Sequence, residues 1–107
     1  MAGPRKWITI AKTDELKPCE HKSVQVEGEL IAVFNLNGKF YGIGDVCTHD
    51  GGILTGGTVD GKVITCPRHG AQFDITTGEV LRMPAFAPVS TFEVRVEGQD
   101  VQLLFES

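Results

Sequence analysis

Apolar and polar residues alternate along short stretches of the chain, and glycine-containing turns separate these stretches. A period of two residues predicts β-strands with one buried face. Strands are expected at residues 7–11, 23–27, 30–36, 39–43, 62–65, 71–75, 79–82, 91–97 and 100–105. One helical turn is expected at residues 13–17, where Pro18 would end it. The pattern therefore predicts an all-β protein built from antiparallel hairpins.

Two glycine dipeptides predict tight hairpin turns. Asn37-Gly38 suits a type I′ turn, because that turn needs a positive φ at both central residues. Asp60-Gly61 is expected to form a second such turn, entered from residues 54–59. Residues 44–52 and 83–88 are expected to be loops, and the second loop is apolar and rich in proline. An apolar loop on a small protein is expected to cover another group.

Composition and charge narrow the possible functions. The 107 residues are expected to form one domain, residues 1–107. Ten basic and fourteen acidic residues give a net charge of −4 without a basic cluster, which argues against nucleic-acid binding. The apolar runs are much shorter than the roughly 20 residues of a membrane span, and the first residues lack the pattern of a signal peptide. A cytoplasmic protein that binds neither nucleic acid nor a membrane is expected.

Cysteine and histidine occur together at two places that fall in predicted loops. Cys47 and His49 form one pair, and Cys66 and His69 form the second. The hairpin between the pairs is expected to bring the two loops side by side, so that all four side chains reach one metal centre. Cys19 makes the number of cysteines odd, which argues against a disulfide framework. We interpret Cys19 as structural or incidental.

Two kinds of metal site suit two cysteines and two histidines. A structural zinc ion takes such a set, and so does a [2Fe–2S] cluster in which histidines replace two of the cysteines. Zinc modules usually pair like ligands, whereas each pair in this chain is mixed. The mixed pairs favour the two-iron cluster, and a small accessory subunit with a zinc site is the alternative.

With these motifs the sequence resembles the Rieske family, in which two loops carry the same C-x-H and C-x-x-H patterns. The resemblance implies an antiparallel β-sandwich base with a small cluster-binding subdomain at about residues 44–80, and a proline loop at residues 83–88 that covers the cluster. It also implies one [2Fe–2S] cluster per chain. Further residues that match the family are Gly70, Phe73, Asp74, Thr77, Gly78 and residues 84–88.

Departures from the family pattern indicate the subfamily. Rieske proteins of respiratory complexes have two extra cysteines where this chain has Gly52 and Arg68. They also have hydroxyl side chains where this chain has Ala71 and Phe73. The two missing hydroxyl groups cannot stabilise the negative charge that reduction adds, and Asp50 beside a ligand opposes that charge. We therefore predict a reduction potential at the low end of the Rieske range, about −150 mV. The chain is therefore most similar to the soluble Rieske ferredoxins of ring-hydroxylating oxygenase systems.

This resemblance implies an electron carrier that is not itself an enzyme. The protein would take one electron from an NAD(P)H-linked flavin reductase and pass it to a terminal oxygenase that acts on aromatic compounds. His49 and His69 are expected at the exposed tip, with Cys47 and Cys66 behind them. A Rieske subunit of a nitrite reductase-like system is a further alternative. An apolar rim for docking is expected from Leu54, Pro84, Phe86 and Pro88, and packing of Phe86 on the domain's own core is the alternative.

Overall fold

Short antiparallel strands make up most of the structure, a computed structural model that describes residues 5–46, 52–67, 70–83 and 87–106. No helix in these ranges is long and apolar enough to cross a membrane. The short 3-10 helix η1 (Thr13–Glu15) follows the first strand. The strands are β1 (Arg5–Lys12), β2 (His21–Val26), β3 (Glu29–Leu36), β4 (Lys39–Gly44), β5 (Val59–Asp60), β6 (Val63–Thr65), β7 (Gln72–Asp74), β8 (Val80–Arg82), β9 (Thr91–Phe92), β10 (Val94–Glu97) and β11 (Asp100–Glu106).

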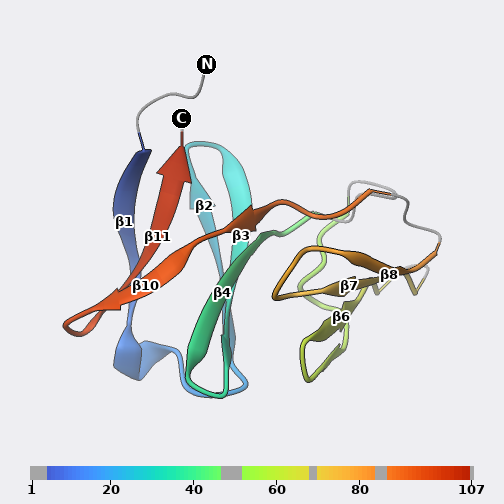
Figure 1. Ribbon diagram of the computed structural model, residues 1–107, viewed down its shortest axis with the longest axis horizontal. Helices are drawn as coiled ribbons and strands as arrows, with labels where there is room; N and C mark the ends of the chain where they lie inside the picture. The colour runs from blue at the N-terminus through green and yellow to red at the C-terminus, as the bar shows by residue number, and fades with distance from the viewer. Residues whose placement is uncertain (1–4, 47–51, 68–69, 84–86, 107) are drawn as a thin grey trace.

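The strands form three antiparallel sheets (Figure 1). The first sheet has the order β1-β11-β10, and the second has the order β2-β3-β4-β9. The third sheet, β5-β6-β7-β8, lies at the other end of the molecule from β1 (Figure 1). This arrangement confirms the all-β, antiparallel fold.

The first two sheets enclose one hydrophobic core, because alternate residues of their strands point inward. In β11, for example, Val101 and Leu103 are fully buried, whereas Gln102 between them is half-buried. Lys22 of β2 ties the sheets together at one edge, where its Nζ donates to the Ile10 carbonyl oxygen at 3.0 Å. The buried members of this core are Ala11, Leu16, Val26, Ile31, Val33, Val101, Leu103 and Phe105.

A second core joins the second sheet to the third. Strand β3 serves both cores: Ile31 and Val33 point into the first, and Ala32 and Phe34 point into the second. This position explains why β3 is a continuous apolar run instead of an alternating one. The buried members of the second core are Ala32, Phe34, Ile43, Leu54, Ile64, Cys66, Ala71, Phe73, Ile75 and Val89.

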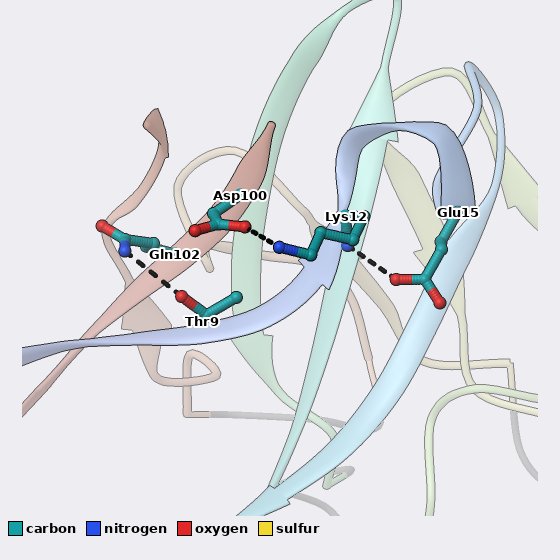
Figure 2. Close-up of polar contacts among 5 residues, drawn as sticks. All are labelled: Thr9, Lys12, Glu15, Asp100 and Gln102. Atoms are coloured by element: carbon teal, nitrogen blue, oxygen red, sulfur yellow. Dashed lines mark hydrogen bonds and ion pairs between the residues drawn. The ribbon is translucent and has the colours of Figure 1, made fainter. Parts of the chain in front are cut away.

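The outer face of the first sheet carries a row of polar contacts (Figure 2). Lys12 of β1 pairs with Asp100 of β11, and Gln102 Nε2 donates to Thr9 Oγ1 at 3.2 Å. The Lys12 backbone N–H donates to Glu15 Oε1 at 2.7 Å at the start of η1. The hydrogen bond and the charge of Asp100 together raise the pKa of the Lys12 ammonium. These contacts hold β1 in register at its end.

Three details of the predicted strands differ in the structure. Asp60 pairs with Val63, so the turn is at residues 61–62, one residue later than predicted. Gly61 occupies the first central position with φ +60°, which is typical of a type II′ turn. Residues 54–57 form turns and bends, so that only β5 (Val59–Asp60) leads into this turn as a strand. The expected strand at residues 91–97 is divided at Glu93, since β9 pairs with β4 and β10 pairs with β11.

Glycine is required at position 78, where the β7–β8 turn touches the chain that leads into β9. The Gly78 N–H donates to the Asp74 carbonyl at 2.7 Å, and the Gly78 carbonyl accepts from the Val89 N–H at 3.0 Å. Its φ is +80°, and a Cβ atom there would lie 2.5 Å from the Val89 carbonyl oxygen. Gly38 has a similar φ of +89° but open space around it.

We predict that Gly78→Ala lowers the free energy of unfolding more than Gly38→Ala does. Both variants place alanine at a positive φ, which costs about 1–2 kcal/mol. Only Gly78→Ala adds an overlap with backbone, which costs about 1–3 kcal/mol more. Urea unfolding of the two variants measures the difference. Equal losses would show that the close contact with Val89 does not constrain the fold.

Candidate metal centre

Cys66, the predicted ligand that the structure describes, directly follows strand β6. Cys66 is 2% exposed and forms no disulfide. The Cys66 N–H donates to the Ala71 carbonyl at 2.7 Å, and its carbonyl accepts from the Gly70 N–H at 3.2 Å. Gly70 has φ +78°, a value that favours glycine. These bonds close a tight loop between β6 and β7 and keep the thiol at its base.

The other three predicted ligands, Cys47, His49 and His69, lie outside the described residues. Asp50, Arg68, Pro84 and Phe86 also lie outside them. Within the ranges that the structure describes, no three His, Cys, Asp or Glu side chains gather as a metal site. The full ligand set and the exposed position of the histidines therefore stay predictions.

The segments that flank the two predicted ligand loops lie against each other. The Thr65 N–H donates to the Thr58 carbonyl at 2.9 Å. Gly57 is so near that an added Cβ atom would lie 1.7 Å from the Thr65 carbonyl oxygen. Leu54 and Cys66 share the second core. The chain that leaves the first loop thus packs on the chain that enters the second, as the hairpin between them predicts.

This arrangement fits a cluster bound between the two loops. A buried thiol without a disulfide is the soft donor that iron–sulfur clusters take, and it lies where the two loops begin and end side by side. The predicted donor set of Cys47, His49, Cys66 and His69 would then be divided evenly between the loops.

Asp45 is a buried acid at the start of the first loop that the sequence analysis overlooked. It is 2% exposed, and its Oδ1 accepts hydrogen bonds from the N–H groups of Leu54 at 3.1 Å and Thr55 at 2.8 Å. Its Oδ2 accepts from Thr55 Oγ1 at 2.6 Å and from Ser23 Oγ at 3.2 Å. The carboxylate therefore joins both ends of the first loop to β2. The only sequence signal was an acid directly after the apolar strand that ends at Gly44.

The two residues that lack a hydroxyl group are both fully buried. Ala71 and Phe73 have exposed fractions of 0%, on either side of the half-buried Gln72. Ala71 accepts the Cys66 N–H through its backbone and leaves no side-chain donor beside that turn. The effect of their missing hydroxyl groups on a reduction potential stays a prediction.

The prediction that Leu54 belongs to an exposed apolar rim is wrong. Leu54 is fully buried, because the bonds from Asp45 to its backbone turn its side chain into the second core. Pro88 is exposed, as expected. Other exposed apolar residues flank the predicted loops: Val46, Ile53, Leu81 and Met83 are 38%, 52%, 45% and 69% exposed.

A groove of about 290 Å³ lies at the opposite end of the third sheet from Cys66. The turns at Gly61 and Thr76 line one wall, and Cys19 and His21 line another. Register places these turns away from the ligand end, because Thr65 pairs with Gln72 whereas Val63 pairs with Asp74. Cys19 is exposed and thus lies in a region apart from Cys66, in keeping with its interpretation as structural or incidental.

Asp74 is a buried carboxylate at this far end. Its Oδ1 accepts from the Thr76 N–H at 2.8 Å and from Thr76 Oγ1 at 2.6 Å, and Oδ2 lies 3.3 Å from Lys62 Nζ. Burial by itself raises the pKa of Asp74. The hydrogen bonds from Thr76 and the interactions with Lys62 outweigh burial, so that the pKa lies below its usual value.

Comparisons with known proteins agree on one family. The model described as the Rieske [2Fe-2S] domain matches residues 6–93. The chain is 33% identical over 98 residues to the ferredoxin component of the naphthalene 1,2-dioxygenase system of Pseudomonas aeruginosa, covering 92% of this chain and 94% of that protein. It is 36% identical over 100 residues to the biphenyl dioxygenase ferredoxin subunit of Pseudomonas sp. strain KKS102, covering 92% of each.

A solved structure gives the same match in three dimensions. A chain of the complex of reduced oxygenase and oxidized ferredoxin in carbazole 1,9a-dioxygenase superimposes with a TM-score of 0.86. The two chains are 34% identical, and the match covers 91% of each. The sandwich and the third sheet therefore recur together in a protein that has been solved with its oxygenase.

We predict that the Asp74 carboxylate stabilises the fold above about pH 4 and that this contribution is lost in acid. Because its folded pKa lies below the unfolded value, stability falls as the pH drops through the folded pKa. Asp74→Asn should cost about 1–2 kcal/mol at neutral pH, since it removes the charge that Lys62 and Thr76 stabilise. Its difference from wild type should shrink toward pH 3.

Chemical unfolding at several pH values measures this difference, and Asp60→Asn in the same sheet is the matched control because Asp60 is exposed. A constant difference between Asp74→Asn and wild type from pH 7 to pH 3 would contradict the linkage.

Proposed function

The chain belongs to the Rieske [2Fe-2S] domain family, and we propose that it binds one [2Fe–2S] cluster through Cys47, His49, Cys66 and His69. It is the ferredoxin component of a ring-hydroxylating dioxygenase system, an electron carrier and not a catalytic oxygenase. The observation that carries the ligand assignment is the buried Cys66 thiol beside the returning end of the first loop. When bound, the cluster supplies one-electron transfer at a potential set by its ligands and their surroundings.

The side chains at positions 71 and 73, beside Cys66 in the second core, are apolar and carry no hydroxyl group. Ala71 and Phe73 fill the space beside it with fully buried apolar side chains. Without O–H donors at these two positions, less negative charge is stabilised there on reduction. We therefore expect a reduction potential near the low end of the Rieske range, about −150 mV.

The electron partners are proposed to be an NAD(P)H-linked flavin reductase and a terminal oxygenase acting on an aromatic compound, in the cytoplasm. A ferredoxin similar to this chain has been solved with an oxygenase, which supports the second partner. Val46 and Ile53 flank the first predicted loop, and Met83 begins the proline loop. Their exposed apolar surfaces are suited to brief contact with a partner near the ligand loops.

We predict that the dithionite-reduced protein gives a rhombic electron paramagnetic resonance signal and that Cys66→Ala abolishes it. The buried thiol is a proposed ligand, and alanine has no donor atom. Cys19→Ala is the matched control, because Cys19 is exposed and lies by the far groove. A colourless wild-type protein with one equivalent of zinc would contradict the cluster. A signal retained in Cys66→Ala would contradict this ligand.

We also predict that Met83→Asp slows electron delivery to an oxygenase, whereas Val96→Asp does not. Met83 adjoins the proposed docking surface, and Val96 is 44% exposed on β10 of the first sheet. A charge buried on docking should cost about tenfold in the rate constant. The oxygenase of a naphthalene 1,2-dioxygenase system serves as the acceptor in stopped-flow measurements. Equal rates for the two variants would place docking elsewhere.

A further inference from the structure

The hydrogen bonds that the structure describes for the Asp45 carboxylate all come from uncharged groups. Its four partners are two backbone N–H groups and two hydroxyl groups, from Leu54, Thr55 and Ser23. Among the residues that the structure describes, no lysine or arginine forms an ion pair with it. Such hydrogen bonds stabilise a carboxylate but do not cancel its charge. The field of that charge therefore extends into its surroundings.

This charge lies close to the first loop. Asp45 is two residues from Cys47, so their Cα atoms are at most roughly 7.6 Å apart. The same carboxylate holds Leu54 and Thr55 beside the segment that leads to Cys66. Because Asp45 itself is only 2% exposed, its charge acts more strongly over this distance than a charge in water would.

We propose that Asp45 is a positioning residue that also lowers the reduction potential of the centre through its buried negative charge. This inference rests on the proposed function, because it needs a cluster at Cys47 and Cys66. Reduction adds an electron to the centre, and a fixed negative charge nearby opposes that addition. The hydrogen bonds from the Leu54 and Thr55 N–H groups to Asp45 hold the charge at a constant distance from the first loop.

The four contacts make it possible to remove the charge without removing the hydrogen bonds that hold the first loop. In Asp45→Asn, the amide oxygen replaces Oδ1 and accepts the N–H groups of Leu54 and Thr55. The amide nitrogen then replaces Oδ2 and faces the hydroxyls of Thr55 and Ser23. A hydroxyl group can accept as well as donate, so both of these bonds re-form with reversed direction. Asp45→Asn is therefore close to a pure change of charge.

A second variant changes the field without altering Asp45. Ser23 is exposed on β2 and lies 3.2 Å from Asp45 Oδ2 through its hydroxyl. Ser23→Lys places a cation beside the carboxylate and should partly cancel its field. Ser23→Gln, similar in length but uncharged, is its matched control. Asp60→Asn, which removes an exposed charge from β5, controls for net charge in the first comparison.

The experiment is a redox titration of the cluster-loaded proteins, followed by electron paramagnetic resonance. We expect Asp45→Asn to favour reduction by about tenfold, which corresponds to a midpoint about 59 mV higher for one electron. Ser23→Lys should have a higher midpoint than Ser23→Gln, and Asp60→Asn should match wild type. The shape of the rhombic signal should stay unchanged in Asp45→Asn, because the hydrogen bonds around residue 45 persist.

Each outcome decides the proposal. If Asp45→Asn keeps the signal but moves the midpoint no more than Asp60→Asn does, the proposal is overturned. If Asp45→Asn does not hold a cluster, the Ser23 pair decides, and equal midpoints for Ser23→Lys and Ser23→Gln overturn it. A wild-type protein without any rhombic signal would instead refute the proposed function itself.

Discussion

The close contact between the chain that leaves the first loop and the chain that enters the second determines the shape of the functional end. Gly57 lies against the Thr65 carbonyl without space for a Cβ atom, and Thr58 and Thr65 are joined by a backbone hydrogen bond. The buried carboxylate of Asp45 fixes the other side of the first loop. The described residues on either side of the two loops are thus anchored at a common place.

Strand β3 connects the third sheet to the remainder of the protein. Its side chains alternate between the two cores, so that the first sheet and the third sheet pack against opposite faces of this strand. Phe34 in the second core and Val33 in the first are both buried. Since protein interiors are close-packed, a shift of the third sheet would disturb the same strand that supports the sandwich.

Much of the fold could be predicted from the sequence, since strand alternation and the Asn37-Gly38 turn depend on neighbouring residues only. The turn position of Gly61 could not be predicted, because either Asp60-Gly61 or Gly61-Lys62 could be the two central residues of a hairpin. Polar and apolar residues alternate through Glu93 without a break. The sequence pattern therefore does not show that the chain passes from the second sheet to the first at this residue. Cysteine and histidine spacing marked the site, but Asp45 looks like any surface acid until its long-range partners are known.

The third sheet and its loops occupy one uninterrupted stretch of chain between two strands that are neighbours in the second sheet. Strands β4 and β9 pair directly, and the Gly44 N–H donates to the Ser90 carbonyl at 2.8 Å. The stretch therefore departs from and returns to the sandwich at almost the same point, like an insertion into a complete host domain. Segments joined through adjacent ends are the ones that proteins accept and exchange most readily. Evolution can thus remodel the end that carries the proposed cluster ligands without changing the connections of the sandwich.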